Sequence, residues 1–454
     1  MKSDGRSKRF DPGRIPDLVS SGSTAMVGGF GLVGAPLSVL GELAKSGVTS
    51  LTIVANNLGE PGLGLGALLR NGQVRHAIGS FFTSNPDAVA AIANGAITVE
   101  LIPQGTLAEA IRAGGAGIPG FFTPTSAGTT LAANRDVRTI SSVECVFQPA
   151  IRGDVALIKA DRADELGNLT YRMTARNFNP AMATAADIVI AEVEEIVPVG
   201  SLSPDDIVTP HLFVDYLVEA RTRREDLGTS SVTDAMRDPT DTEIAMAARV
   251  RKELRAGQVV NLGIGLPALV VRFIKPEDSI FIHTENGLLG AGPPPEAGSA
   301  LEYPVDAAKH PLTELPGAAY FDSADSFAMI RGGHIDVAVM GALQVDRQGT
   351  LANWAVPPKT YGVGGAMDLA AGAQRVIVMM SHLAPNGSSK IVEQCSLPVT
   401  ARNCVDTVIT DMGLFRTRDG ALILEEIMPG HSIDEIRAAT ATEFAYVPHA
   451  NQSA

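Results

Sequence analysis

The chain has 454 residues, too many for one ordinary domain and enough for two or three domains with a large buried core. Its composition, 45% hydrophobic and 19% charged with 46 glycines, excludes a disordered or fibrous protein and suits a globular α/β protein. The formal net charge of −14 argues against nucleic acid or an anionic membrane as a partner.

The beginning of the chain, MKSDGRSKRFDPGRIPDLV, is basic but has no apolar segment of the kind found in signal peptides. No later run reaches the ~18 apolar residues that a membrane span needs. Cys145, Cys395 and Cys404 are widely separated, which signals neither a disulfide framework nor a zinc site. We therefore expect a soluble protein of the reducing cytoplasm that holds no metal.

Short apolar runs rich in β-branched residues recur along the chain and are separated by segments of helix length. This pattern predicts mostly parallel sheets covered by helices. In such sheets ligands bind beyond the carboxyl ends of the strands, where Asn56, Asn261 and Glu285 are expected. The runs are TAMVGGF, LTIVA, ITVELI, DVALIKA, DIVIAEV, QVVNLGI, SIFIH, IDVAVMGA and RVIVMM.

The first strand leads into GFGLVG, residues 29–34, which has the G-x-G-x-x-G spacing of dinucleotide-binding loops. A dinucleotide site would also require an acidic residue at the end of the next strand, to hold the ribose. That strand instead ends in Ala55, Asn56 and Asn57. We interpret the glycines as a tight turn.

An internal repeat divides the chain. The segment DVALIKADRADELGNLT, beginning at Asp154, aligns without a gap with DVAVMGALQVDRQGTLA, beginning at Asp336. Upstream, SGSTAMVGGFG resembles AGQVVNLGIG, and LTIVANN falls where SIFIHTEN falls in the second copy. The repeat predicts two similar α/β domains.

A charged stretch without an apolar period separates the two copies. We expect a first domain over residues 1–220, a linker over 221–240, and a second domain over 241–454.

The chain resembles the family I CoA-transferases of the 3-oxoacid type, with both subunit types fused in one polypeptide. The resemblance extends from about residue 15 to residue 447, and it departs from the family pattern at Thr284, where serine is usual, and in GSFFTSNPDA, near the expected acyl pocket. The matching motifs are VGGFGLVGAP, PQGTLAEAIRAGGAGIPGFFTPT, GNLTYRMTARNFNPAM, VNLGIGLP, HTENGLLGAGPPP, DSFAMIRGGHIDVAVMGALQV, GTLANWAVPPK and GVGGAMDL.

The resemblance implies a ping-pong transfer of CoA through a glutamyl-CoA thioester, with Glu285 as the nucleophile. Gln104 and the backbone N–H of Gly365 would stabilise the oxyanion. CoA is then a substrate and no cofactor is needed. The resemblance also implies that Asn56, Asn261 and Lys309 contact CoA.

The donor and acceptor stay open at this stage. The resemblance implies succinyl-CoA as donor and acetoacetate or 3-oxoadipate as acceptor, with short fatty acids such as acetate as the alternative. Two other functions stay possible for the sequence. One is a CoA thioester hydrolase on the same scaffold, and the other is a non-catalytic or sugar-phosphate-binding protein. We expect a homodimer of the fused chain. We also expect His283 and His334 to be structural or exposed, and Trp354 to lie in the core or in a pocket wall.

Overall fold

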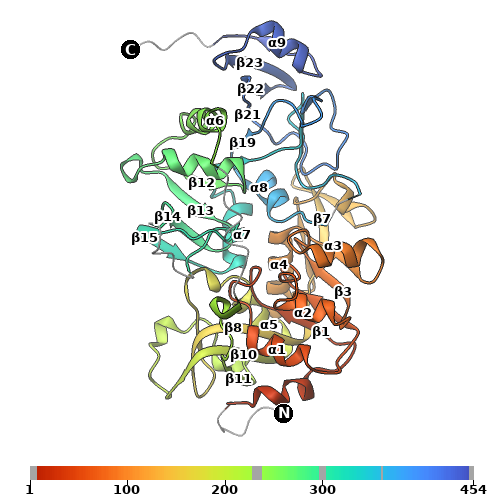
Figure 1. The fold of residues 1–454 in the computed structure, drawn as a ribbon, viewed down its shortest axis with the longest axis vertical. Helices are drawn as coiled ribbons and strands as arrows, with labels where there is room; N and C mark the ends of the chain where they lie inside the picture. Colours follow the sequence, from red (N-terminus) through yellow and green to blue (C-terminus); the bar gives the residue numbers. More distant parts are fainter. Residues whose placement is uncertain (1–7, 228–237, 296–302, 359–360, 449–454) are drawn as a thin grey trace.

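The computed structural model describes residues 8–227, 238–295, 303–358 and 361–448. Figure 1 shows the first half of the chain toward the N-terminal end of the long axis and the second half toward the C-terminal end. Helix α4 (Gln104–Gly115) of the first half packs against α7 (Ser323–Arg331) and α8 (Ala366–Gly372) of the second. These three helices therefore form the centre of the contact between the halves.

The first half is built on an eight-stranded sheet in the order β11-β10-β8-β1-β2-β3-β4, with β9 added to β8. Every pairing along this path is parallel, as predicted. A small antiparallel sheet, β5-β7-β6, lies beside it. The elements are β1 (Thr24–Val27), α1 (Leu37–Ala44), β2 (Leu51–Val54), α2 (Leu65–Arg70), β3 (Val74–Gly79), α3 (Pro86–Ala93), β4 (Thr98–Leu101), α4, β5 (Gly120–Thr123), β6 (Val137–Ile140), β7 (Val143–Pro149), β8 (Gly153–Asp164), β9 (Leu169–Thr170), α5 (Asn179–Thr184), β10 (Ala186–Val197) and β11 (Tyr216–Glu219).

The second half is built on a ten-stranded sheet in the order β15-β14-β13-β12-β16-β19-β21-β22-β23-β24. A three-stranded sheet, β18-β17-β20, accompanies it. The elements are α6 (Asp241–Arg251), β12 (Val259–Leu262), β13 (Phe281–Thr284), β14 (Leu288–Ala291), β15 (Glu314–Tyr320), α7, β16 (Val337–Met340), β17 (Gln344–Asp346), β18 (Leu351–Ala352), α8, β19 (Val376–Met379), β20 (Ile391–Val392), β21 (Thr407–Ile409), β22 (Gly413–Arg418), β23 (Ala421–Ile427), α9 (Ile433–Ala439) and β24 (Ala445–Tyr446).

The predicted fold class, two α/β halves with mostly parallel sheets, is confirmed, but the second sheet has antiparallel pairs on both sides of its parallel centre. The central strands, in the order β13-β12-β16-β19-β21, are parallel. The pairs β13–β14, β14–β15, β21–β22 and β22–β23 are antiparallel, and the outermost pair β23–β24 is parallel. The pair β22–β23 is joined by Asp419 and Gly420, both with positive φ, as a two-residue hairpin turn requires. Short turns of this kind can join only antiparallel strands.

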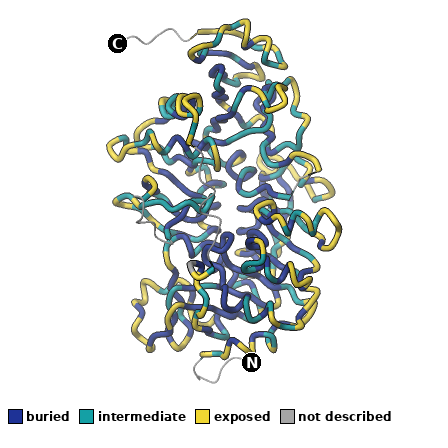
Figure 2. The backbone as a smooth tube through the Cα atoms, viewed as in Figure 1, coloured by how far each residue is buried: buried dark blue, intermediate teal, exposed yellow. Residues whose placement is uncertain are grey.

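Both faces of each large sheet are buried, which explains the continuous apolar runs in the sequence. Along β1, Ala25 and Val27 belong to one core cluster while Met26 belongs to another. Successive side chains of a strand point to opposite faces, so the sheet is the wall between these two clusters. Figure 2 shows the resulting band of buried backbone through the middle of the molecule.

The internal repeat has the same structural basis in both halves. Asp154 accepts a hydrogen bond from the N–H of Thr24, the first residue of β1, at 2.7 Å. Asp336 accepts the corresponding bond from Val259, the first residue of β12, also at 2.7 Å. The aligned aspartates therefore join equivalent neighbouring strands.

The domain boundaries stay a prediction. The large sheet of the first half ends at Glu219, and α6 of the second half begins after Thr240, whose side chain forms a capping box with Glu243. Residues 228–237 of the expected linker lie outside the described residues. Among those described, no helix is long and apolar enough to cross a membrane.

Candidate active site

Glu285 lies at the carboxyl end of β13, in the turn that leads into β14. The N–H of Gly287 donates to the carbonyl of Thr284 at 3.0 Å and closes the turn. Asn286 is fully buried and its amide donates to the carbonyl of Val305 at 2.8 Å. These contacts fix the backbone on both sides of Glu285, whose own side chain stays partly accessible.

A side-chain amide from the first half meets this carboxylate. Nε2 of Gln104 donates to Oε1 of Glu285 at 3.0 Å. The amide oxygen of Gln104 accepts from Nδ2 of Asn56 at 2.6 Å and from Oγ of Ser80 at 2.9 Å. Both bonds polarise the amide and keep its N–H groups directed at Glu285.

The topology of the first sheet explains this grouping. Asn56 follows β2, Ser80 follows β3, and Gln104 begins the helix after β4. These three strands are parallel neighbours, so their carboxyl ends lie at one edge. Sequence reasoning missed Ser80, although its position directly after a strand is the signal that identified Asn56.

Gly365 lies against the other oxygen of the carboxylate. It is the N-cap of α8, and a Cβ at this position would overlap Oε2 of Glu285. The preceding Gly364 accepts from the N–H of Gln104 at 2.9 Å and donates to the carbonyl of Ser80 at 3.1 Å. The predicted catalytic residues Glu285, Gln104 and Gly365 are therefore in one place, and their roles stay a prediction.

A second buried carboxylate lies beside Glu285. Asp368, in the first turn of α8, is fully buried and accepts from the N–H of Gly105 at 2.8 Å and from Oγ1 of Thr125 at 3.3 Å. It therefore joins α8 of the second half to the start of α4 in the first. Sequence reasoning missed Asp368, because an acid near a helix N-terminus is ordinarily a solvated residue.

These surroundings shift the titration of both acids. Burial and, to a smaller degree, the charge of Asp368 raise the pKa of Glu285 to about 7, and the hydrogen bond from Gln104 opposes the rise. Burial raises the pKa of Asp368 to about 6, against the opposing charge of Arg331. Glu285 is thus ionised less readily than a surface glutamate, and the hydrogen bond from Gln104 favours its ionised form.

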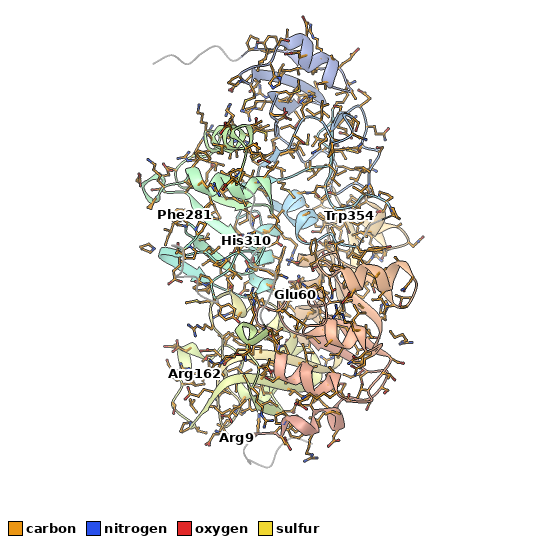
Figure 3. The ribbon with its side chains drawn as sticks, in the orientation of Figure 1. Arg9, Glu60, Arg162, Phe281, His310 and Trp354 are labelled. Atoms are coloured by element: carbon orange, nitrogen blue, oxygen red, sulfur yellow. The ribbon has the colours of Figure 1, made fainter. Side chains whose placement is uncertain are left out.

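The residues expected to contact CoA are held by protein partners. The amide of Asn56 bonds to Gln104, and that of Asn261 donates to the carbonyl of His283 at 3.2 Å. Nζ of Lys309 lies 3.4 Å from the carboxylate of Glu60, which Figure 3 labels near the middle of the molecule. The contacts of these residues with CoA stay a prediction.

The glycine turn after β1 is packed against the second half of the chain. Gly31 has a φ of +68°, and a Cβ there would lie 2.5 Å from Cε of Lys309. Glycine is therefore required both by the backbone conformation and by the approach of this lysine. The turn thus receives a side chain from the other half.

Two expectations about other groups can be compared with the structure. His283 is buried, lies 3.2 Å from Oγ of Ser326, and has its pKa lowered to about 4 by burial, which fits the structural role expected for it. Within the described ranges, no group of three or more His, Cys, Asp or Glu is arranged to hold a metal ion.

Comparison with known proteins identifies relatives over nearly the whole chain. Residues 14–220 and 244–439 match the family model described as Coenzyme A transferase. The mouse protein succinyl-CoA:3-ketoacid coenzyme A transferase 2A, mitochondrial, is 40% identical over 465 residues, which cover 97% of this chain and 89% of that protein. The beta subunit of the acetate CoA-transferase of Escherichia coli is 47% identical over 45% of this chain and 94% of its own length.

The fold is also found in solved structures. The acyl-CoA transferase YdiF of Escherichia coli O157:H7, solved as a thioester complex with CoA, superposes with a TM-score of 0.82. The match covers 99% of this chain and 96% of that one at 20% identity, so it bears on the fold alone. The beta subunit of the acetate CoA-transferase is a separate polypeptide and aligns with 45% of this chain. This coverage agrees with the prediction that two subunit types are fused in one polypeptide here.

Proposed function

This chain belongs to the coenzyme A transferase family, and we propose on that premise that it transfers CoA from succinyl-CoA to a 3-oxoacid. The observation that carries the proposal is the 3.0 Å hydrogen bond from Gln104 to Glu285, which joins the two halves at a partly accessible carboxylate. A polarised amide on a carboxylate with a raised pKa suits covalent catalysis at that carboxylate.

In the first half-reaction Glu285 attacks the thioester carbonyl of succinyl-CoA. The carbon–sulfur bond breaks, and CoA leaves as a thiolate while an acyl-glutamyl anhydride forms. The thiolate then attacks the glutamyl carbonyl of this anhydride and releases succinate. The product is a glutamyl-CoA thioester, which conserves the energy of the original thioester. In the second half-reaction the acceptor carboxylate attacks this thioester and the same steps run in reverse.

Each attack on a carbonyl generates an oxyanion that needs hydrogen-bond donors. Nε2 of Gln104 already lies at Glu285, and we propose the backbone N–H of Gly365 as the second donor. Removing one donor of this kind typically lowers kcat by about 10²–10³. In every step an acyl group passes between a carboxylate and a thiolate, and no proton is transferred. We therefore propose that CoA is a substrate and that no cofactor takes part.

The covalent intermediate provides the decisive experiment. The wild-type protein incubated with succinyl-CoA alone, then reduced with borohydride, should carry a reduced side chain at Glu285 that mass spectrometry of its peptides detects. Glu285→Gln should fold, show no such mass change and lose nearly all transfer. A modified peptide elsewhere, or normal transfer by Glu285→Gln, would disprove this mechanism.

The acceptor has one alternative with a specific basis, because a relative is named an acetate CoA-transferase. Initial rates with succinyl-CoA and each of acetoacetate, 3-oxoadipate and acetate distinguish a 3-oxoacid acceptor from acetate. We expect the highest kcat/KM with a 3-oxoacid. Release of free CoA at a steady rate without any acceptor would instead indicate the hydrolase.

The assembly and location of the protein are proposals of the same standing. We propose a homodimer of the fused chain in the cytoplasm, although the mouse relative is named as mitochondrial. Sedimentation analysis of the purified chain tests the homodimer, and microscopy of a tagged chain tests the cytoplasmic location.

A further inference from the structure

The backbone around Gln104 is held by the second half of the chain, although its side chain is held by the first. The N–H of Gln104 itself donates to the carbonyl of Gly364 at 2.9 Å. The N–H of the next residue, Gly105, donates to Oδ2 of Asp368 at 2.8 Å. The two peptide groups that flank the Cα of Gln104 are therefore both bonded to the second half.

Arg331 holds the carbonyl that follows. Its Nη1 donates to the carbonyl of Gly105 at 3.0 Å, and its Nη2 donates to Oε2 of Glu109 at 3.2 Å. Arg331 is the last residue of α7, and its side chain is only 17% exposed. Hydrogen bonds from a charged guanidinium are stronger than those between neutral groups. The second half thus binds three backbone groups at the start of α4.

A buried ring lies against two glycines at this contact. A Cβ at Gly105 would lie 2.5 Å from Oδ1 of Asp368 and 2.5 Å from Cδ1 of Phe327. A Cβ at Gly365 would lie 3.1 Å from Cε1 of the same ring. Phe327 is fully buried, and close-packed interiors transmit displacements rather than absorb them. The start of α4 is therefore in close contact with both α7 and α8.

The reacting carboxylate touches the same end of α8. Gly365, the N-cap of α8, lies against Oε2 of Glu285, and Asp368 is in the first turn of the helix. One helix end therefore contacts the carboxylate and also the backbone that carries its donor amide. A displacement of about 1 Å at a reacting group can cost about 10²-fold in rate, so the contacts that set this relative position bear on the reaction.

We propose that Arg331 and Asp368 are positioning residues for CoA transfer, which fix the start of α4 so that the amide of Gln104 lies at Glu285. This inference rests on the proposed function, because it requires that Gln104 takes part in the reaction. Both residues act through the amide rather than on the reacting atoms. The role of Asp368 is separate from the effect of its charge on Glu285, since a neutral oxygen could accept the same N–H bond.

A double-mutant cycle on the full chain tests this role. Arg331→Met removes the bonds to Gly105 and Glu109, and should lower kcat for transfer from succinyl-CoA to acetoacetate by about 10–100-fold, with KM for succinyl-CoA changed about twofold at most. On a Gln104→Ala background the same change should have no further effect, because no amide remains to be positioned. Rates are measured at pH 8, above the pKa of about 7 of Glu285 and the pKa of about 6 of Asp368.

Arg112→Met is the matched control. Arg112 donates to the same carboxylate of Glu109, at 2.7 Å, but lies on α4 itself with a side chain that is 47% exposed. Its loss should leave kcat unchanged. Arg331→Lys keeps a cationic donor and should recover part of the rate that Arg331→Met loses. The cycle is repeated with Arg331→Lys, so that the test stands even if Arg331→Met does not fold.

Two substitutions separate the acceptor role of Asp368 from its charge. Asp368→Asn keeps an oxygen that can accept from the N–H of Gly105, whereas Asp368→Ala removes it. At pH 8 Asp368→Ala should lower kcat about tenfold more than Asp368→Asn does. Equal rates in these two variants overturn the positioning role of Asp368.

The cycle also distinguishes failure of this inference from failure of the proposed function. A structural arginine would lower the rate by the same factor with and without the amide. Equal losses from Arg331→Met on both backgrounds therefore overturn the positioning role, and they leave the proposed reaction standing because Gln104→Ala has still lowered kcat. An unchanged kcat in Gln104→Ala alone overturns the positioning role together with the proposed oxyanion role of the amide.

Discussion

Replacing Gln104 by alanine tests whether the amide acts on the reaction or only on substrate binding. The change removes the 3.0 Å hydrogen bond to Glu285 and leaves Asn56 and Ser80 without their shared acceptor. Loss of one oxyanion donor predicts that kcat and kcat/KM fall together by roughly 10²–10³. This corresponds to about 2.7–4 kcal/mol of transition-state stabilisation.

The same substitution has a second effect that a pH profile resolves. Because the bond from Gln104 opposes the rise in the pKa of Glu285, removing it should move that pKa further above about 7. The ionised form would then be scarcer at neutral pH, so the loss of activity should be greater at pH 6.5 than at pH 8. Initial rates of the half-reaction with succinyl-CoA across this range, together with full transfer assays, measure both effects.

Ser80→Ala is the matched control, because it removes one of the two bonds to the amide oxygen and keeps the amide itself. We expect a loss of about tenfold or less, in line with one neutral hydrogen bond. A Gln104→Ala variant with raised KM but unchanged kcat would refute the oxyanion role. A pH profile that moves to lower pH would refute the electrostatic reasoning.

Three further changes test the charges at the site. Asp368→Asn removes a negative charge from beside Glu285. The acid limb of the pH–rate profile, expected near pH 7 in wild type, should therefore move to lower pH in this variant. An unmoved limb would show that the two acids are not coupled. Because the pKa of Glu285 is raised from 4.5 to about 7, the folded state loses stability as pH rises through this window, and Glu285→Gln should unfold at a higher temperature than wild type at pH 8 but not at pH 4.5. Equal midpoints at pH 8 would contradict the burial of this charge. Lys309→Ala should raise KM for CoA esters more than for truncated thioesters that lack the nucleotide, and equal effects on both would exclude a phosphate contact.

Much of the site could be predicted because it follows from strand order. Asn56 and Gln104 each follow a predicted strand of the first sheet, whose parallel strands have their carboxyl ends at one edge, and Glu285 follows a predicted strand of the second sheet. The repeat, found as a constant offset between aligned aspartates, correctly indicated two equivalent halves. The Asp419–Gly420 dipeptide was a readable hairpin signal, and it accounts for one antiparallel margin that the prediction of parallel strands omitted.

What could not be predicted depends on contacts between residues far apart in the chain. In sequence, Asp368 looks like any acidic residue near a helix N-terminus. It is distinguished only by packing between the halves, which places its carboxylate at the N–H of Gly105 in the first half. The pairing of Lys309 with Glu60 spans the same interface. Neither pair has a sequence spacing that marks it, since the two partners lie on separate halves whose docking no local pattern describes.

The division of the active site between two halves also has a consequence during biosynthesis. Gln104 and Asn56 are translated well before Glu285, so the amide and the residue that bonds to its oxygen are present in the growing chain before the carboxylate that the amide meets. The two halves must then pack together before Glu285 accepts the hydrogen bond from Gln104. A chain that ends before Glu285 therefore lacks the carboxylate, and on the mechanism proposed above it cannot form a glutamyl-CoA thioester.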